Sequence, residues 1–352
     1  MSLYNNKLYM EDIKYIANLD LPWERLQNKS IMLSGATGLI GSFLIDVIFE
    51  KNTSSNLNCT IYALGRDKEK VQQRFINNCE STNFRFIQHD VNEPFENKEI
   101  GEINYIFHLA AKTNPILYAT DPIGTITTNI IGLQNLLEFS VKHNTERFVF
   151  ASSNEIYGEN RGDIELFDET YCGYIDSNTL RAGYPESKRC GEALCQAYKM
   201  QKNSDVIIAR FTRTYGPSTI MNDSKAINQF IKNGVEEKDI VLKSNGSQYY
   251  SFLYVSDAVG GLLTALFRGI NGEAYNISDE NSDITLKDLA VMIAEMIGKN
   301  VVYEIPDSIE SIGYSKATKA RLSGQKLQGL GWKAKYNIHD GLERTIKILK
   351  SF

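Results

Sequence analysis

The sequence contains no apolar stretch long enough to cross a membrane. A spanning helix needs about 20 consecutive apolar residues, and no run within the 352 residues approaches that length. The first seven residues, Met1-Ser-Leu-Tyr-Asn-Asn-Lys7, are polar and lack the apolar centre of a signal peptide. These absences predict a soluble cytoplasmic protein that has no membrane partner.

Histidine and cysteine are scarce, and neither shows the spacing of a metal site. The chain has 4 histidines and 5 cysteines, and no two cysteines form a CxxC pair. An odd number of cysteines in a chain of this size favours free thiols in a reducing cytosol over a disulfide framework. We therefore predict no metal ion, and we expect buried thiols at Cys59, Cys79, Cys172, Cys190 and Cys195.

Runs of basic residues are also absent. The formal net charge is -5, and basic side chains do not alternate with aromatic ones in any repeat. Such a chain lacks the positive surface that nucleic acids require, so we predict no nucleic-acid partner. An anionic substrate would need cations placed locally in its binding site.

The sequence does contain a regular alternation of apolar strand patterns and amphipathic helix patterns. Hydrophobic residues make up 42% of the chain and charged residues 23%, which suits one large α/β unit with a smaller second lobe. Strands covered by helices on both faces form continuous apolar runs. We predict an α/β fold, a Rossmann-type doubly wound parallel sheet with a smaller C-terminal α+β substrate lobe. The expected strands are 30–33, 60–64, 84–87, 105–109, 147–151 and 205–210, and the expected helices between them are 39–50, 67–78, 123–143 and 182–200.

The same alternation gives the expected domain boundaries. Residues 1–28 are interpreted as an N-terminal helical extension, and residues 29–213 as the dinucleotide-binding Rossmann domain, to which 252–270 also belong. The alternation loosens around Tyr215-Gly-Pro217. Residues 214–352 are therefore expected to form mainly the substrate-binding lobe.

A glycine-rich turn connects the first expected strand to the first helix. Gly35, Gly38 and Gly41 allow a tight turn, a close approach of the backbone to a pyrophosphate and close packing of helix on strand. The start of the helix would face the anion. This turn predicts a dinucleotide cofactor, held by the whole segment Gly35, Thr37, Gly38, Leu39, Ile40 and Gly41.

The second expected strand leaves the choice between NAD and NADP open. A carboxylate that binds the ribose 2'-hydroxyl is expected near its end, but Leu64 is followed by Gly65, Arg66 and Asp67. Arg66 would pair with a 2'-phosphate or cover the adenine, and Asp67 could turn back to the ribose. We rank NAD ahead of NADP. Asp90 and Val91 come after the third strand and are candidates for contacting the adenine; a strand-end turn is the alternative interpretation.

Tyr184 and Lys188 stand four residues apart, on one face of an expected helix. A phenol with a pKa of about 10 is a poor base at neutral pH, and a neighbouring ammonium favours the phenolate. Opposite charges about 4 Å apart attract by roughly 4 kcal/mol at an effective dielectric near 20, enough to lower such a pKa by about three units. The pair therefore predicts carbonyl/alcohol chemistry that depends on a nicotinamide cofactor.

Several motifs occur in an order that resembles a known family. They are the glycine turn, His108-Leu109-Ala110-Ala111, Thr128-Asn129, Ser152-Ser153-Asn-Glu-Ile-Tyr157-Gly158, Tyr184-x-x-x-Lys188 and Tyr254-Val-Ser-Asp257. Together they resemble the extended short-chain dehydrogenase/reductase family, in its NAD-dependent nucleotide-sugar epimerase, dehydratase and decarboxylase branch. Within that branch, Arg181-x-x-Tyr184, Met221-Asn-Asp223 and Gly246-Ser-Gln248 are most similar to UDP-glucuronate decarboxylases.

This resemblance implies roles for single residues. Ser153 would hydrogen-bond the sugar O4 beside Tyr184, while Lys188 would also hold the nicotinamide ribose. The remaining cofactor contacts implied are Leu109, Ala110, Ala111 and Asn129. Tyr184 would remove the O4 proton as the C4 hydride leaves, which gives a 4-keto sugar. The family also implies a homodimer formed by helices 123–143 and 182–200.

Residues 154 and 155 bear on the fate of the 4-keto sugar. Sugar 4,6-dehydratases carry an Asp-Glu pair here, in which the aspartic acid protonates the leaving oxygen, but this chain has Asn154 and Glu155. An amide does not donate a catalytic proton as a carboxylic acid does, so dehydration is disfavoured. Glu155 remains able to remove a proton.

Decarboxylation is also weakened. The decarboxylases carry an arginine where this chain has Tyr250, and a phenol offers one donor in place of a guanidinium's five. Arg213 and Lys225 are candidates to restore the missing charge for a diphosphate, with surface ion pairs as the alternative. Asn154 and Tyr250 are further expected substrate contacts.

These observations favour an epimerase that acts on a nucleotide-diphospho-sugar through a transient 4-keto intermediate. Decarboxylation and 4,6-dehydration are the alternatives within the family. A reductase that consumes NADPH is a third possibility, suggested by Arg66. A non-catalytic cofactor-sensing or scaffold protein is the alternative of another class.

Overall fold

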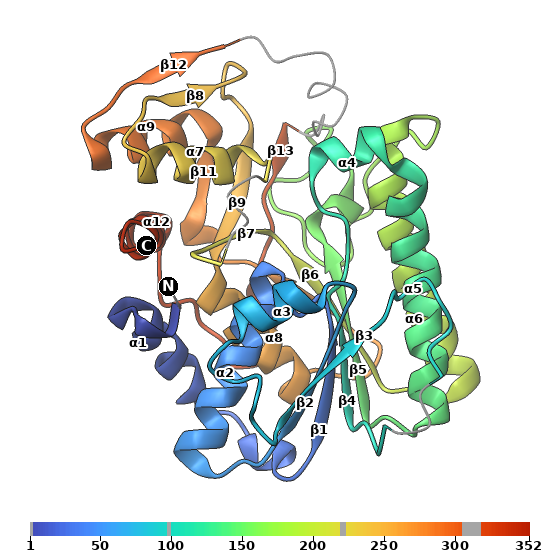
Figure 1. The fold of residues 1–352 in the computed structure, drawn as a ribbon. Coiled ribbons are helices and arrows are strands. Elements are labelled where there is room, and N and C mark those ends of the chain that lie inside the picture. The colour runs from blue at the N-terminus through green and yellow to red at the C-terminus, as the bar shows by residue number, and fades with distance from the viewer. Residues whose placement is uncertain (1–2, 97–99, 219–222, 305–317) are drawn as a thin grey trace.

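The computed structural model describes residues 3–96, 100–218, 223–304 and 318–352. Met221 and Asn222 of the decarboxylase-like motif lie outside these ranges. The largest element is a seven-stranded sheet in the order β10-β6-β5-β4-β1-β2-β3 (Figure 1). Its strands are β1 (Ser30–Ser34), β2 (Thr60–Gly65), β3 (Phe84–Gln88), β4 (Tyr105–His108), β5 (Arg147–Ser153), β6 (Val206–Phe211) and β10 (Ala274–Ile277).

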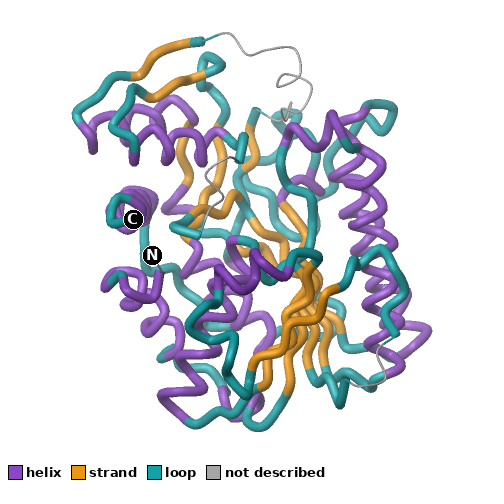
Figure 2. The backbone as a smooth tube through the Cα atoms, in the orientation of Figure 1, coloured by secondary structure: helices purple, strands orange, loops and turns teal. Residues whose placement is uncertain are grey.

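Every neighbouring pair in this sheet is parallel. The sheet lies between two layers of helices, with α2 and α8 on one face and the parallel pair α5 and α6 on the other (Figures 1 and 2). These helices are α2 (Leu39–Ser55), α5 (Pro122–Lys142), α6 (Gly183–Lys202) and α8 (Val255–Arg268). All five residues of β1 are buried, as a strand covered on both faces requires. The predicted Rossmann-type doubly wound sheet is confirmed.

A short helical segment precedes the sheet. It consists of η1 (Leu3–Asn5), α1 (Lys7–Ala17) and η2 (Trp23–Leu26). Asp12 of α1 is fully buried and accepts hydrogen bonds from the hydroxyls of Tyr254 and Tyr336, both at 2.7 Å. Arg344 forms an ion pair with the same carboxylate at 2.8 Å. The N-terminal helix is thus attached to segments more than 240 residues away in the chain.

The smaller lobe is built from elements late in the sequence. Figure 1 shows α7, α9, β8 and β12 as a group beside the large sheet, joined to it through β9. A second small sheet has the order β11-β9-β13, with β7 also paired to β9. The elements are β7 (Arg213–Tyr215), α7 (Ala226–Val235), β8 (Ile240–Leu242), β9 (Tyr249–Tyr254), β11 (Asp283–Thr285), α9 (Leu286–Ile297), β12 (Val301–Tyr303), β13 (Lys319–Ala320), α11 (Gln325–Gln328) and α12 (Ile338–Leu349).

The chain passes between the two lobes. The segment 252–270, expected to return to the Rossmann domain, contains α8. The sheet also gains β10 from residues 274–277, beyond that range. The precise division into domains remains a prediction.

Two smaller expectations were wrong. The helix expected over 67–78 is α3 (Lys68–Arg74), because Phe75 leaves the helical conformation at its C-cap and its ring is buried against Phe84, with centroids 5.4 Å apart. Of the thiols expected to be buried, those of Cys172 and Cys190 are exposed.

Among the described helices, none combines the length and apolar character needed to traverse a bilayer.

The remaining short elements lie close to the carboxyl ends of the strands or connect the lobes. They are α4 (Pro115–Thr120), η3 (Asn154–Tyr157), η4 (Leu180–Ala182) and η5 (Glu280–Ser282). Of these, α4, η3 and η4 bring side chains to the candidate active site.

Candidate active site

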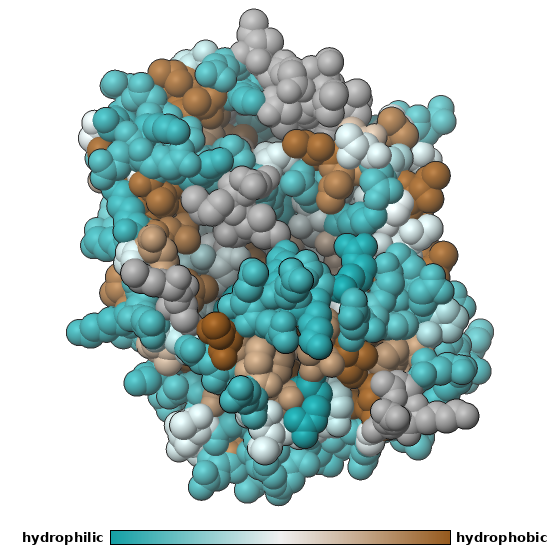
Figure 3. Space-filling view, in the orientation of Figure 1, coloured by the Kyte–Doolittle hydropathy of each residue, from teal (hydrophilic) through white to brown (hydrophobic). Residues whose placement is uncertain are grey.

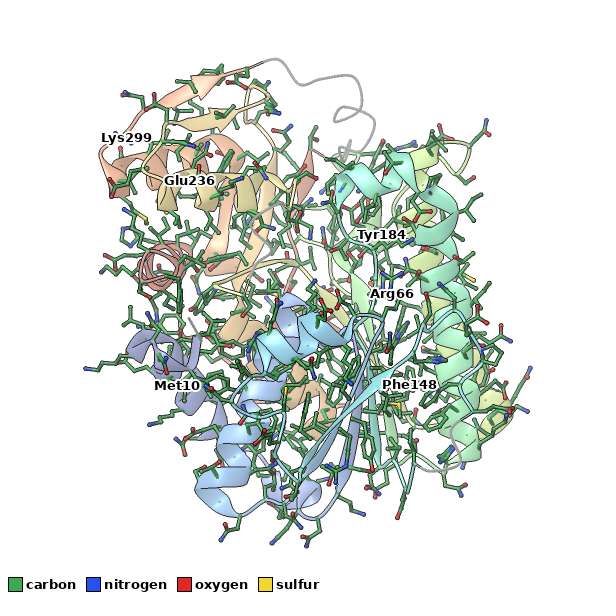
Figure 4. All side chains as sticks on the ribbon, in the orientation of Figure 1. Met10, Arg66, Phe148, Tyr184, Glu236 and Lys299 are labelled. Atoms are coloured by element: carbon green, nitrogen blue, oxygen red, sulfur yellow. The ribbon has the colours of Figure 1, made fainter. Side chains whose placement is uncertain are left out.

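The candidate catalytic residues meet at the carboxyl ends of the parallel strands. Ser153 is the last residue of β5, and η3 starts directly after it with Asn154 and Glu155. Tyr184 and Lys188 lie in the first two turns of α6. Figure 4 shows Tyr184 above the strand ends, while Phe148 lies lower within the sheet. This edge is where open α/β sheets bind their ligands.

The glycine turn has the shape of a dinucleotide site. Gly35 has φ +75°, and a Cβ placed on it would lie 2.8 Å from the backbone N of Ala110. A Cβ on Gly41 would lie 2.4 Å from the carbonyl oxygen of Gly35. Gly38 is the N-cap of α2, and no side chain caps that helix start. The N–H of Gly38 donates to the Gly35 carbonyl, and no side chain of the described residues caps the N–H groups that follow it. The segment from Gly35 through Thr37, Leu39 and Ile40 to Gly41 therefore fits a pyrophosphate.

The residues expected near the adenine and its ribose interact with one another. Arg66 lies 3.7 Å from the carboxylate of Asp90 and is largely exposed. Asp67 is the N-cap of α3 and accepts from the N–H of Lys70, so its carboxylate already serves the helix start. The backbone of Val91 is held by Asn135, whose side-chain amide donates to the Val91 carbonyl at 2.9 Å.

The end of β4 lies directly beside the glycine turn. The N–H of Leu109 donates to the Ser34 carbonyl at 3.2 Å, and the N–H of Ala110 donates to the Ser34 hydroxyl at 3.3 Å. Ala111 is the next residue and is half-buried. His108 is fully buried with its Nδ1 2.7 Å from the Ser34 hydroxyl. Burial and the nearby Lys188 charge lower the pKa of His108 to about 3, so the imidazole is neutral.

Asn129 connects α5 to the helix that carries the tyrosine. Its side chain is fully buried and donates to the Ser187 hydroxyl at 2.9 Å. Ser187 in turn donates to the carbonyl of Tyr184 at 2.8 Å. Asn129 therefore fixes the first turn of α6. Its Oδ1 has no hydrogen-bond partner among the described residues.

Tyr184 is buried in the structure and its phenol is protonated. Burial raises the pKa of Tyr184 to about 12, and the charge of Glu155 acts in the same direction. A hydrogen bond with Ser153 and the charge of Arg181 lower the pKa but do not reverse the effect of burial. Burial therefore opposes the phenolate that the spacing of Tyr184 and Lys188 favours.

Lys188 explains part of this difference. It is 2% exposed, and its ammonium nitrogen donates to the Ala151 carbonyl at 2.7 Å. The same nitrogen lies 5.9 Å from the centroid of the Tyr184 ring. Burial lowers the pKa of Lys188 to about 7, against the charge of Glu192, which raises it. The helix brings the two side chains together as predicted, but desolvation makes both less charged than expected.

Glu155 and Asn154 line one cavity of about 180 Å³ with Arg181 and Arg213. The Glu155 side chain is 22% exposed, and Asn154 is buried. The N–H of Glu155 donates to the Ser153 hydroxyl at 3.2 Å, so the short helix η3 sets the position of both side chains relative to that serine. A potential base, a neutral amide and two cations thus line one cavity, and the Glu155 charge is close enough to act on Tyr184.

The residues expected to bind the diphosphate do not all lie in one place. The guanidinium carbon of Arg213 lies 3.4 Å from the centroid of the Tyr250 ring, and its Nη1 is buried without a hydrogen-bond partner among the described residues. Lys225 instead contacts Asp223 at 3.2 Å and the Thr113 hydroxyl at 3.1 Å, and it does not line the cavity. Arg213 and Tyr250 meet, whereas Lys225 lies apart from the cavity in an ion pair.

Two residues in contact with the site were not predicted from the sequence. Arg181 forms an ion pair with Glu155 at 2.7 Å, and Tyr118 of α4 stacks on Tyr184 with ring centroids 4.9 Å apart. The contact of Arg181 could have been predicted, because the Arg181-x-x-Tyr184 spacing places the arginine about one helical turn before the tyrosine. Tyr118 comes from a distant helix, and nothing in its local sequence indicates this contact.

Comparisons with known proteins agree with this geometry. The model of the NAD dependent epimerase/dehydratase family matches residues 31–278. The chain belongs to that family. It is an enzyme of the nucleotide-sugar epimerase, dehydratase and decarboxylase group, and the predicted NAD cofactor is the one on which the family depends. The glycine turn and the bare start of α2 are the features of this chain that fit NAD.

The relatives most similar in sequence include decarboxylases. UDP-glucuronic acid decarboxylase 3 of Arabidopsis thaliana is 31% identical over 315 residues, which cover 90% of this chain and 87% of that protein. UDP-glucuronic acid decarboxylase 1 of Xenopus tropicalis is 30% identical over 318 residues, 90% of this chain and 71% of that protein.

Solved structures with this fold include an epimerase and a dehydratase. The UDP-glucuronic acid 4-epimerase of Bacillus cereus aligns with a TM-score of 0.78 and 23% identity, covering 92% of this chain and 99% of that one. The dTDP-glucose 4,6-dehydratase of Bacillus anthracis str. Ames aligns with a TM-score of 0.75 and 21% identity, covering 92% and 97%. At these identities the likeness concerns the fold.

Proposed function

We propose that the protein epimerises a nucleotide-diphospho-sugar through a transient 4-keto intermediate. The observation that carries this proposal is the pairing of Asn154 with Glu155 in one cavity, with the Glu155 charge close enough to act on Tyr184. The cavity has a carboxylate that can remove a proton, but position 154 offers an amide where dehydration needs an acid. Ser153 and Tyr184, joined by a hydrogen bond, would contact the sugar O4.

The first half-reaction depends on Tyr184. Its hydroxyl would take the proton of the sugar O4, with Ser153 orienting that oxygen. NAD, when bound, supplies the acceptor for the C4 hydride. The phenol must first release its own proton to solvent, and the phenolate then accepts the O4 proton. The charge of Arg181 favours this release, and the Lys188 ammonium lies 5.9 Å from the ring centroid. The product of this half-reaction is a 4-ketone.

The second half-reaction would invert one stereocentre of the sugar. The ketone either turns in the cavity and receives hydride on its opposite face, which inverts C4, or Glu155 removes the proton at C5 and a proton returns on the other face. In the C5 route the hydride then returns to C4 on the face from which it left, so both routes reduce the ketone and restore the cofactor. An epimerase of this kind needs no net supply of oxidant or reductant.

Decarboxylation of a UDP-linked uronic acid is the second candidate. Relatives of this chain from Arabidopsis thaliana and Xenopus tropicalis are UDP-glucuronic acid decarboxylases. The Arg213 guanidinium against the Tyr250 ring also supports it, because a guanidinium stands next to the position where those enzymes are expected to carry one. In this alternative the ketone would lose the C5 carboxylate as carbon dioxide.

Product analysis with purified protein distinguishes these reactions. The protein is incubated with UDP-glucuronic acid and then with UDP-, CDP-, GDP- and dTDP-hexoses, and products are identified by NMR. A new stereoisomer of the same mass supports epimerisation. Release of carbon dioxide assigns the protein as a decarboxylase, and a stable 4-keto-6-deoxy sugar assigns it as a dehydratase; either result refutes the proposal.

We further propose that two copies associate through α5 and α6. Ile123 and Ile131 of α5 are 75% and 43% exposed, and Met200 near the end of α6 is 86% exposed. Figure 3 shows hydrophobic side chains among hydrophilic ones along this edge of the molecule. Analytical ultracentrifugation should show a dimer that Ile131→Glu weakens, with Ile270→Glu, an exposed isoleucine outside both helices, as the matched control.

A further inference from the structure

Arg181 contacts the predicted base of the site directly. It lies in η4, immediately before α6, and its Nη2 donates to Oε2 of Glu155 at 2.7 Å. Both side chains are largely buried, at 14% and 22% exposure. A charge-assisted hydrogen bond of this length between two buried groups restricts the carboxylate to one place.

The same guanidinium also acts on the catalytic tyrosine through an aromatic ring. The guanidinium carbon lies 4.7 Å from the centroid of Tyr118. The Tyr118 ring in turn stacks on Tyr184, with centroids 4.9 Å apart and planes inclined by 26°. Burial raises the pKa of Tyr118 well above its usual value, so this ring is a neutral spacer. Arg181, Tyr118 and Tyr184 form a three-layer stack.

The surroundings argue against a purely structural ion pair. Nε and Nη1 of Arg181 are buried and lack hydrogen-bond partners among the described residues. Burying a guanidinium that is only partly hydrogen-bonded is costly, and a buried ion pair is weak evidence for a gain in stability. The guanidinium is instead placed where it contacts the two groups that the proposed reaction uses, Glu155 and, through Tyr118, Tyr184.

We propose that Arg181 is a positioning residue that holds the Glu155 carboxylate in place to remove the proton at the sugar carbon next to the 4-ketone. This inference rests on the proposed function, since it needs the ketone. Arg213 lines the same cavity, as do the polar side chains of Asn154, Glu159, Asp176 and Thr179. The hydroxyls of Tyr118, Tyr184 and Tyr250 are also close enough to interact with this carboxylate.

The step that Arg181 serves is a proton transfer. The C5–H bond breaks, an O–H bond forms on Glu155, and the electron pair moves onto the oxygen of the 4-ketone as an enolate. Return of a proton to C5 restores the ketone and the carboxylate. No redox change occurs in this step, and in deuterated water the returning atom is deuterium.

Separating this exchange from the hydride step tests the inference. Arg181→Met keeps much of the side-chain length but removes the charge, and Arg181→Lys keeps the charge. With UDP-glucuronic acid as the probe in deuterated water, two quantities are measured: deuterium at C5 by NMR, and reduced nicotinamide by its near-ultraviolet absorbance.

In Arg181→Met we expect C5 exchange to fall by about tenfold or more, since a misplaced catalytic group can cost up to about a hundredfold. Formation of reduced nicotinamide should fall much less than the exchange, because Arg181 reaches Tyr184 only through the Tyr118 ring and Lys188 stays beside the phenol. This retained activity also shows that the variant is folded. Arg181→Lys should recover most of the exchange. Arg85→Met, which makes the same replacement at an exposed arginine of β3 away from the cavity, should behave as the native protein in both measurements.

The inference is overturned if Arg181→Met lowers both quantities equally, if it leaves exchange unchanged, or if Arg181→Lys recovers no more than Arg181→Met. Its failure differs from failure of the proposed function. Native protein that forms reduced nicotinamide but exchanges no deuterium refutes only the role of Arg181 and Glu155. Native protein that forms no reduced nicotinamide with any nucleotide sugar refutes the function itself, and this inference with it.

Discussion

The guanidinium carbon of Arg213 lies 3.4 Å from the centroid of the Tyr250 ring. The two residues come from the paired strands β7 and β9, whose register aligns Arg213 with Phe252, two residues after Tyr250. The family resemblance implies an arginine at position 250, where this chain has tyrosine. A positive charge on the neighbouring strand β7 thus lies against the Tyr250 ring and lines the cavity, and the tyrosine supports it as an aromatic platform.

We expect Arg213→Met to weaken binding of UDP by about 10- to 100-fold, because a hydrogen bond to a charged group contributes roughly 1.5 to 3 kcal/mol. Arg213→Lys should lie between this variant and the native protein. Lys225→Met is the matched control, since Lys225 is already paired with Asp223 outside the cavity. Isothermal titration calorimetry with UDP measures all three, and a larger loss in Lys225→Met than in Arg213→Met would contradict this assignment.

Tyr184 is expected to control the first half-reaction. Tyr184→Phe retains the ring that stacks on Tyr118 but loses the hydroxyl, so it should fold normally and form reduced nicotinamide about 100-fold more slowly or not at all. Stopped-flow absorbance of the reduced cofactor with UDP-glucuronic acid measures the rate. Tyr118→Phe removes a hydroxyl from the adjacent ring and serves as the control. Equal rates in the native protein and Tyr184→Phe would exclude the proposed base.

The fold was predictable because its signals are local. The glycine turn, with Gly35 in a left-handed conformation and Gly41 packed against it, appears in sequence as a spacing within seven residues. The buried strands appear as apolar runs. The relation between Tyr184 and Lys188 is likewise set by helical spacing alone.

The electrostatics of the site were not predictable in the same way. The sequence shows that Lys188 lies one turn after Tyr184, but not that both are buried, and burial raises the pKa of the phenol and lowers that of the amine. Tyr118 reaches Tyr184 only because α4 packs beside α5 and η4. Desolvation and stacking of this kind depend on tertiary contacts between distant segments.

The buried lysine predicts a pH-dependent stability. The pKa of Lys188 falls from 10.5 to about 7 on folding, so between these values the unfolded chain binds more protons than the folded one. The stability of the native protein relative to Lys188→Met should therefore increase with pH in this window. From about pH 6 to about pH 9 we expect a relative gain of about 2 to 3 kcal/mol.

Urea denaturation of both proteins at the two pH values measures this difference. Lys199→Met is the control, since Lys199 is a half-buried lysine further along α6 that donates to the Asn271 carbonyl. The difference in unfolding free energy between Lys199→Met and the native protein should be the same at the two pH values. A constant difference between the native protein and Lys188→Met would show that the ammonium is not desolvated in the folded state.

The attachment of the N-terminal helix predicts a large effect at Asp12. Asp12→Ala removes the acceptor for the Tyr254 and Tyr336 hydroxyls and leaves Arg344 without its buried partner. Breaking such a pair from one side costs about 3 to 5 kcal/mol. Glu11→Ala is the matched control, because Glu11 contacts the same arginine from the surface, where a pair contributes about 1 kcal/mol or less. Denaturation curves of similar midpoint for the two variants would contradict the proposed anchoring.

The glycine turn allows a test of cofactor binding that does not depend on the sugar. In Gly41→Ala the new methyl group would lie 2.4 Å from the Gly35 carbonyl oxygen, so the start of α2 must move away from β1. Overpacking of this kind costs about 1 to 3 kcal/mol, and the displaced N–H groups should weaken NAD binding by about tenfold or more. Gly101→Ala is the control, because among the described residues no atom beyond its chain neighbours lies within 4 Å of a Cβ at that exposed position. Equal affinities of the two variants for NAD in a direct titration would mean that the pyrophosphate does not bind at this turn, and the cofactor would have to be placed elsewhere on the sheet.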